Sequence, residues 1–211
     1  MTGLAVAFLA ATLVAAAVDW VAVVRDDRRT EYVAKPLTMV LLICTALALD
    51  PADGTARGWF VVALLFSLAG DVFLMLPQDL FVAGLAAFLF GHIAYVVGMH
   101  VDGVDGARFL VGVAVVMVLL GVVGTLILRG VRGGLHPELA GPVVAYMFVI
   151  SAMVASAIGT GHVTAIAGAS SFYASDALIA WNRFIRETPH ARVAIMVTYH
   201  LAQVGLILSL V

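Results

Sequence analysis

The chain has 211 residues, of which 64% are hydrophobic and 11% are charged, and its mean hydropathy is +1.12. A soluble domain would carry about 25% charged residues. The composition therefore excludes an ordinary soluble protein and indicates an integral membrane protein. The net charge of −2 gives no reason to expect a nucleic-acid partner.

Apolar stretches of the length that an α-helix needs to cross a bilayer, about 20 residues, follow one another along the chain. Polar breaks separate eight expected helices, at 3–24, 36–50, 58–76, 80–100, 108–128, 138–158, 163–183 and 191–211. No polar stretch is long enough for a separate soluble domain. We therefore expect an all-α integral membrane protein in which 1–211 forms a single transmembrane domain.

Local signals refine this reading. The pair Lys35-Pro36 stands where the second expected helix begins, which fits a proline in the first helical turn. The connection 77–79 is so short that the helices on either side of it should form a tight antiparallel hairpin. In the fourth helix Gly84, Gly91 and Gly98 recur every seven residues, a stripe of small residues suited to close helix packing.

The basic residues orient the protein. The loops after the first, third, fifth and seventh helices hold nine cations: Arg25, Arg28, Arg29, Lys35, Arg129, Arg132, Arg183, Arg186 and Arg192. The opposite loops hold two, Arg57 and Arg108. Because cytoplasmic loops carry the excess of Lys and Arg, we expect the nine-cation side to face the cytoplasm. Both termini would then lie on the other side of the cell membrane.

Two aspartates lie deep inside apolar stretches: Asp71 in FSLAGDVFLML and Asp176 in SFYASDALIAW. A carboxylate at bilayer depth costs at least ~2.5–3.5 kcal/mol, so an intramembrane acid is a functional hypothesis by default. Both acids fall in the cytoplasmic half of their helices under the expected orientation. The sequence therefore predicts a site built on Asp71 and Asp176 that opens to the cytoplasmic leaflet.

Other polar side chains in the expected helices are candidates to support that site or to bind its substrate. They are Asp19, Lys35, Ser67, His92, Tyr95, Ser175, Asn182, Arg183, Tyr199, His200 and Gln203. Each also has a structural reading: the acids can pair with Lys35, Arg183 or a serine, and the histidines and tyrosines can be satisfied core residues or interhelical donors.

A weak internal repeat links the two halves. The segment 69–95, AGD…GHIAY, resembles 174–203, ASD…YHLAQ, and each aspartate precedes a His-x-Ala in the next helix. This pattern predicts two parallel four-helix repeats with the acids facing each other across a pseudo-two-fold axis. The alternative is convergence of unrelated polar helices.

Several familiar chemistries lack their motifs. No G-x-S-x-G or H-E-x-x-H sequence occurs. His92 and His200 are isolated rather than paired at metal-ligand spacing, so we expect neither a metal nor another cofactor.

The order and spacing of four motifs resemble those of the YhhN-like family, the lysoplasmalogenase family of eight-span membrane proteins. The motifs are S-x-x-G-D-x-x-L at 67–74, G-H-x-x-Y at 91–95, S-D-x-x-x-A-x-x-R-F at 175–184 and Y-x-x-A-Q at 199–203. The resemblance implies hydrolysis of the vinyl-ether bond of a lysophospholipid drawn from membrane lipids, which yields a fatty aldehyde and a glycerophospho-head group. It also implies that Asp71 and Asp176 are the key acids.

The chemistry of a vinyl ether agrees with paired acids. Its hydrolysis needs a carboxylic acid to protonate the β-carbon and a carboxylate to stabilise the resulting cation and activate water. Two carboxyl groups in different surroundings can divide these roles, as in glycoside hydrolysis. Lys35, Arg183 or Arg186 could hold the phosphate. Two rival readings remain, a small-molecule or proton-coupled transporter and a purely structural protein, and aldehyde release from lysoplasmalogen separates them from an enzyme.

Overall fold

The computed structural model describes residues 1–211 and contains helices and no strand. The α-helices are α1 (Gly3–Val24), α2 (Arg28–Ala48), α3 (Gly54–Met75), α4 (Phe81–Asp102), α5 (Gly106–Leu119), α6 (Thr125–Gly133), α7 (Ala140–Thr160), α8 (Val163–Phe184) and α9 (Ala191–Leu208). A π-helical turn, η1 (Leu120–Gly124), joins α5 to α6, and a 3-10 turn, η2 (Pro137–Leu139), precedes α7. Eight helical segments are long and apolar enough to cross a membrane, which confirms the expected number.

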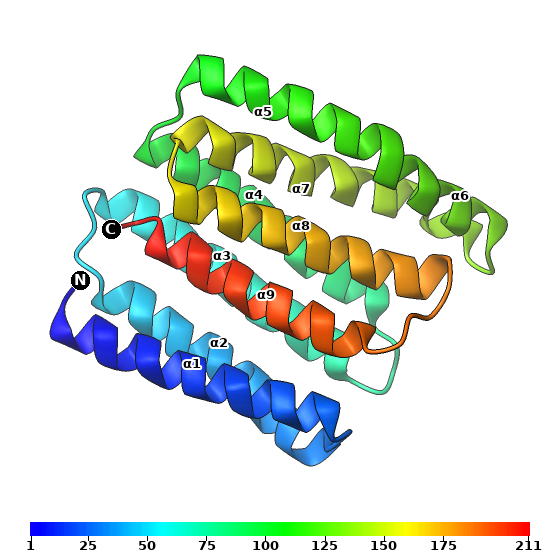
Figure 1. Ribbon diagram of the computed structural model, residues 1–211, viewed down its shortest axis with the longest axis horizontal. Coiled ribbons are helices and arrows are strands. Elements are labelled where there is room, and N and C mark those ends of the chain that lie inside the picture. The colour runs from blue at the N-terminus through cyan, green and yellow to red at the C-terminus, as the bar shows by residue number, and fades with distance from the viewer.

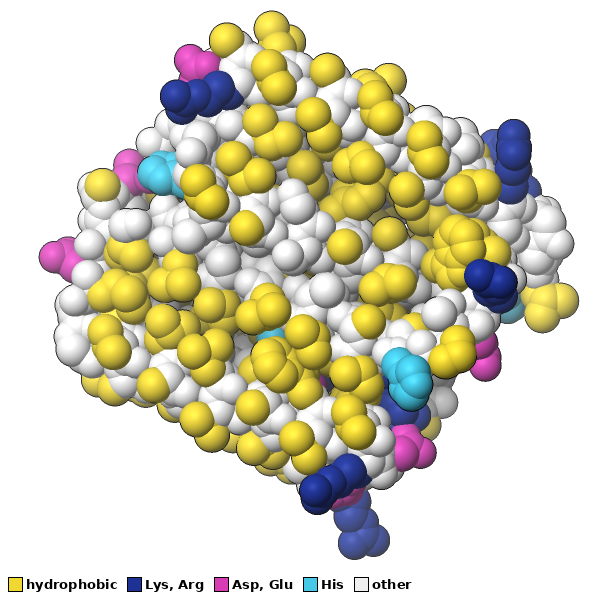
Figure 2. Space-filling model, in the orientation of Figure 1, with side chains coloured by type: hydrophobic (Ala, Val, Ile, Leu, Met, Phe, Trp, Pro, Cys, Tyr) yellow, Lys and Arg dark blue, Asp and Glu magenta, His cyan; other side chains and the backbone are white.

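The helices lie side by side along one common direction (Figure 1). The α1–α2 pair forms one edge of the bundle and α5 the other, while α3 and α4 lie behind α8 and α9 in this view (Figure 1). Both termini lie at one end, and the α1–α2, α3–α4, α6–α7 and α8–α9 connections lie at the opposite end, which we call the loop end (Figure 1). Most Lys and Arg side chains visible in Figure 2 lie toward the loop end, and hydrophobic side chains cover the face between the ends.

Helix α2 begins earlier than the sequence suggested, and the reading of Pro36 as a first-turn residue is wrong. The Asp27 side chain accepts hydrogen bonds from the backbone N–H of Thr30 at 3.3 Å and from its hydroxyl at 2.6 Å. This cap starts the helix at Arg28, so Pro36 lies inside it. The same hydrogen bonds hold the pKa of Asp27 below its usual range.

The hairpin of α3 and α4 is packed as the glycine stripe predicted. A Cβ atom added at Gly91 would lie 3.2 Å from the carbonyl oxygen of Ala63, so the two backbones approach closely there. At Gly84 and Gly98 an added Cβ would instead collide with the side chains of Leu74 and Phe60. The hairpin thus fixes the position of Asp71 on α3 relative to His92 on α4. The proposed relation between the two halves of the chain stays a prediction.

Candidate active site

A cavity of about 760 Å³ lies at the loop end, and both Asp71 and Asp176 line it. Its deep wall comes from α2, α3, α4, α8 and α9, and its mouth is made of residues in or beside the α1–α2, α3–α4 and α8–α9 connections. The two acids that the sequence singled out therefore share one chamber. Four cations also line it: Arg28, Lys35, Arg183 and Arg192.

Asp71 is held by two buried partners. The Lys35 ammonium lies 3.2 Å from Oδ1, and the Tyr199 hydroxyl donates a hydrogen bond of 2.6 Å to Oδ2. Asp71 is 2% exposed and Lys35 is 6% exposed, so this ion pair is part of the protein interior. Lys35 is thus a buried partner of one acid rather than a residue reaching to the rim.

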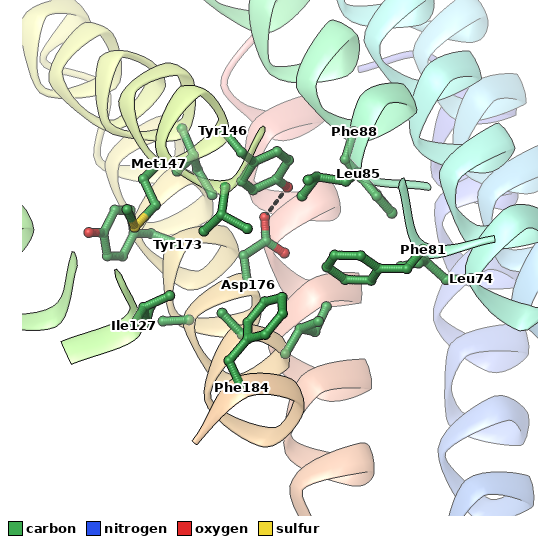
Figure 3. Close-up of a pocket in the computed structure, with 15 residues that line it drawn as sticks. Leu74, Phe81, Leu85, Phe88, Ile127, Tyr146, Met147, Tyr173, Asp176 and Phe184 are labelled. Atoms are coloured by element: carbon green, nitrogen blue, oxygen red, sulfur yellow. Dashed lines mark hydrogen bonds between the residues drawn. The ribbon is translucent and has the colours of Figure 1, made fainter. Parts of the chain in front are cut away.

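Asp176 has different surroundings. Its Oδ2 accepts a hydrogen bond from the Tyr146 hydroxyl of α7 (Figure 3). The Nε2 atom of His92 lies 3.9 Å from the same oxygen. Neither ring nitrogen of His92 has a hydrogen-bond partner. The carboxyl group therefore has a phenolic donor and a histidine contact, and no Lys or Arg within ion-pair distance.

A second, apolar pocket meets the polar cavity at Asp176. Fourteen of its fifteen lining residues are hydrophobic, and the carboxyl group of Asp176 stands among them (Figure 3). Phe81 and Phe88 line both spaces, as does Leu74. We call this pocket the apolar slot. Asp176 thus lies where a charged chamber and the apolar slot join.

Aromatic rings tie the surroundings of the two acids together. Phe172 packs edge-on against His92, with ring centroids 4.6 Å apart, and against Tyr199 at 5.4 Å. Phe88 also packs edge-on against Tyr199, at 5.8 Å. The partners of Asp71 and Asp176 therefore belong to one packed cluster.

The remaining predicted residues divide into those that line the chamber and those that lie behind it. Ser175 lines the chamber, but its hydroxyl donates to the backbone oxygen of Ile195 at 3.1 Å. Tyr95 donates to Oε1 of Gln203 at 2.5 Å, deep between α4 and α9. Ser67 is buried on α3 and makes no side-chain hydrogen bond to Asp71. The hydrogen bonds of Ser175 and Tyr95 are of the kind that holds helices together.

Asp19 and His200 form a second polar region beside α1. Asp19 is fully buried and neither carboxyl oxygen has a hydrogen-bond partner. The Trp20 indole N–H donates to Nδ1 of His200 at 3.1 Å, and Nε2 of that histidine has no partner. Asp19 lies close enough to Lys35 and Asp71 for their charges to interact.

Two predicted residues lie at the mouth of the cavity. The Arg183 guanidinium makes two hydrogen bonds to the Asp79 carboxylate, Nη1 to Oδ1 at 3.0 Å and Nη2 to Oδ2 at 2.9 Å. Arg183 thus pairs with the α3–α4 loop rather than with Asp176. This guanidinium holds the pKa of Asp79 below its usual range. Asn182 accepts from the backbone N–H of Thr188 at 2.7 Å and so shapes the α8–α9 connection.

The sequence analysis missed several contributors. Tyr146 contacts Asp176, Arg192 bridges Asp26 and Glu31 across the mouth, and Asp79 pairs with Arg183. The sequence did contain one indication of the role of Tyr146, because this residue places a hydroxyl group within an otherwise apolar helix. No cluster of three or more His, Cys, Asp or Glu side chains is placed to hold a metal ion, and metal independence stays a prediction.

The fold and the cavity define a class: a multi-pass helical membrane protein with two acids in a chamber joined to an apolar slot. The YhhN family model matches residues 30–210, and the chain belongs to this family. Residues 1–29, which include all of α1, lie outside the matched range.

Relatives with assigned names support the same assignment. The chain is 32% identical to "Lysoplasmalogenase TMEM86B" of Sus scrofa over 83% of this chain and 73% of that protein. It is 33% identical to the Homo sapiens protein of the same name over 70% of this chain and 61% of that protein. It is 32% identical to "Lysoplasmalogenase" of Mycobacterium bovis over 79% of this chain and 65% of that protein. The matches thus span between 61% and 73% of these relatives' lengths. No solved structure matches the chain.

Proposed function

We propose that this protein is a lysoplasmalogenase, a membrane hydrolase that cleaves the vinyl-ether bond of a 1-alkenyl lysophospholipid. The observation that carries the proposal is the position of Asp176, where the charged chamber and the apolar slot join, with Asp71 in the same chamber. A lysophospholipid has the same division, because its vinyl ether lies between a charged head group and an apolar chain. The names of the relatives support this substrate class.

In the proposed binding mode the first carbons of the alkenyl chain occupy the apolar slot, whose cavity volume is about 60 Å³, and the glycerophospho-head group occupies the chamber of about 760 Å³. Leu85, Ile127 and Met147 give the chain surroundings as apolar as the bilayer that it leaves, so its entry into the slot costs little. The vinyl-ether carbons then lie beside Asp176. Shape and polarity, rather than contacts to the double bond, place the reacting atoms.

In the proposed reaction Asp176 donates a proton to the β-carbon of the vinyl ether, which gives an oxocarbenium ion. Low-polarity surroundings without a cationic partner favour the protonated form of a carboxyl group, and the Asp176 side chain has such surroundings. The Tyr146 hydroxyl orients the carboxyl group through Oδ2, leaving Oδ1 free to carry the proton toward the substrate.

Asp71 takes the second role in this mechanism. An adjacent ammonium group favours the ionised form of a carboxyl group, and Lys35 supplies it. The Asp71 carboxylate stabilises the cation and removes a proton from the water that attacks it. Asp71, now protonated, gives its proton to the glycerol oxygen as the hemiacetal breaks its bond to that oxygen, and the Asp176 carboxylate takes the proton of the hemiacetal hydroxyl. A fatty aldehyde and a glycerophospho-alcohol leave, and both acids return to their starting states. One water is consumed, and no oxidant or reductant is needed.

The deciding experiment is aldehyde release by the purified protein from a 1-alkenyl lysophospholipid. In D₂O the aldehyde, trapped at once by reduction, should carry one deuterium at the carbon next to the carbonyl group. Asp71→Asn and Asp176→Asn should each abolish turnover, because an amide cannot cycle a proton. Asp176→Asn should keep the stability of the wild type, whereas Asp71→Asn, which leaves the buried Lys35 ammonium without its carboxylate, should fold with lower stability. Asp102→Asn, at the opposite end of the bundle, is the matched control.

Three results would contradict the proposal. Transport without aldehyde release would indicate a carrier instead of an enzyme. Near-wild-type rates in either site variant would remove the two-acid mechanism. Activity lost on chelation and restored by one metal ion would replace it with metal-assisted hydrolysis.

We also propose that the loop end faces the cytoplasm of the cell membrane, so that both termini lie outside. Lys35 is buried beside Asp71, and the eight remaining cations expected at the loop end, against Arg57 and Arg108 at the other end, support this orientation. The mouth of the chamber would then open to the cytoplasmic leaflet.

A further inference from the structure

Four cations line the chamber, and three of them have a buried acid as a partner. Lys35 pairs with the buried Asp71. On the α1–α2 side of the mouth Arg192 and Arg28 share Glu31, whose side chain is only 9% exposed, and they also contact Asp26, whose side chain is 74% exposed. Arg183 differs from these three, because its one acid partner is largely in water.

That partner is Asp79, whose side chain is 68% exposed. It belongs to the short α3–α4 connection, where its backbone φ of 49° is left-handed, a conformation that aspartate adopts more readily than most residues other than glycine. A solvated carboxylate can leave its partner for water at small cost, since exposed ion pairs contribute little to stability. The Arg183–Asp79 pair is therefore the one at the mouth that a ligand could exchange.

The guanidinium would keep its place after such an exchange. Its Cζ atom lies 4.0 Å from the centre of the Phe81 ring, and Phe81 packs edge-on against Phe184. Both rings also line the apolar slot. Arg183 is thus held at the mouth of the chamber by contacts that do not involve Asp79.

The position along α8 also fits a head group. Arg183 lies seven residues after Asp176, so it is about 10 Å further toward the mouth. The planar guanidinium of Arg183 presents two N–H donors as a fork, which binds both carboxylate oxygens of Asp79. The same geometry can bind two oxygens of a phosphate. A glycerophosphate that extends from a vinyl ether at Asp176 toward the mouth would meet this fork.

We propose that Arg183 binds the phosphodiester of the lysophospholipid and that Asp79 occupies this site as an internal anion when no lipid is bound. The inference rests on the proposed function for the identity of the lipid. It adds a residue-specific phosphate subsite and a competitor built into the protein. Binding of lipid then requires that Asp79 release the guanidinium.

Binding to a lipid that cannot be hydrolysed tests this inference without relying on turnover. The two probes are 1-O-alkyl-glycerophosphoethanolamine and 1-O-alkylglycerol, which share a saturated ether chain and differ in the phosphate head group. Arg183→Gln should weaken binding of the phosphate-bearing probe by about 10- to 100-fold, as expected for loss of a charge-assisted hydrogen-bonded pair. Binding of the neutral probe should change by less than about twofold.

Asp79→Asn gives the opposite and more diagnostic change. It should tighten binding of the phosphate-bearing probe by about 3- to 10-fold, because the internal competitor is removed while the fork remains. A gain in affinity cannot result from misfolding. Since Asp79 acts only through Arg183, the double variant should bind as Arg183→Gln does. Arg132→Gln, another exposed arginine at the loop end but outside the cavity, is the matched control.

Two results would overturn the inference: equal effects of Arg183→Gln on both probes, or weaker binding of the phosphate-bearing probe by Asp79→Asn. Inorganic phosphate as a competitor separates a lipid head-group site from a general anion site. Inorganic phosphate should displace the phosphate-bearing probe only at concentrations far above that of the probe. Equal potency of inorganic phosphate and the probe would contradict a lipid site. Failure of aldehyde release with these binding results intact would overturn the proposed function alone.

Discussion

The Lys35 ammonium lies 3.2 Å from Oδ1 of Asp71 in an interior where both side chains are almost fully buried. The pair joins α2 to α3, and Tyr199 of α9 adds a third helix. A charge in such a place is tolerated only with its partner, because removing one member leaves the other unpaired in a low-dielectric interior. The pair therefore links the stability of the bundle to the chemistry proposed for the chamber.

Lys35→Met should lower the free energy of unfolding by about 3–5 kcal/mol, because it leaves the buried Asp71 carboxyl group without its cation. Aldehyde release should be lost as well. The double variant Lys35→Met/Asp71→Asn should recover most of the stability and none of the activity. Thermal unfolding in detergent measures the first effect. A double variant as unstable as Lys35→Met would show that the ion pair is not the cause.

Tyr146→Phe should lower kcat by about 10- to 100-fold with little change in KM, because the hydrogen bond that orients Asp176 is lost. Steady-state kinetics with a 1-alkenyl lysophospholipid measures the effect. The control is Tyr32→Phe, because Tyr32 does not line the chamber and its hydroxyl donates to the backbone oxygen of Met75 rather than to either acid. Equal losses in the two variants would assign Tyr146 a purely structural role.

Acidic pH should tighten binding of the phosphate-bearing alkyl probe to the wild-type protein. Arg183 holds the pKa of Asp79 below its usual range. The ion pair is therefore fully formed at pH values above the ordinary pKa of aspartate, and it is lost as the pH falls through the lowered pKa. Protonation releases the guanidinium while the phosphodiester stays charged. Titrated side by side, the wild type and Asp79→Asn should converge in affinity at low pH. Parallel curves would exclude Asp79 as the titrating competitor.

Asp19→Asn should raise the melting temperature, because neither oxygen of this buried carboxyl group has a hydrogen-bond partner. Each 1 kcal/mol gained in the free energy of unfolding should raise the melting temperature by about 2–4 °C in a chain of this size. We expect kcat to fall several-fold at the same time, since Asp19 interacts with the charges of Lys35 and Asp71. Unchanged stability and unchanged kcat together would make Asp19 an inert core residue.

Cysteine labelling tests the proposed orientation. Single cysteines at Arg132 and at Asp102, placed in a Cys44→Ser background, should react with an impermeant reagent from opposite sides of the membrane. We expect the first to label only from the cytoplasm, because the loop end carries most of the basic residues. The reverse pattern would place the mouth of the chamber on the outer side.

The sequence predicted much of the fold because each membrane helix carries its own signal in length and hydropathy. It also brought Asp71 and Asp176 forward, since a carboxyl group in an apolar helix is costly enough to stand out. Pro36 was misplaced because the cap at Asp27, not the proline, sets the start of α2. Asp79 and Tyr146 went unnoticed for a different reason. Their roles depend on partners 104 and 30 residues away, and no local pattern reports such a distance.

The meeting of two unlike spaces at Asp176 also bears on how the proposed products would leave. After cleavage the fatty aldehyde remains among hydrocarbon side chains, whereas the glycerophospho-alcohol stands among charged groups at the mouth. Each fragment prefers the environment that it already occupies, so the two have no reason to follow one route. A reactive aldehyde would pass toward lipid and the soluble fragment toward water, and their separation would oppose the reverse reaction.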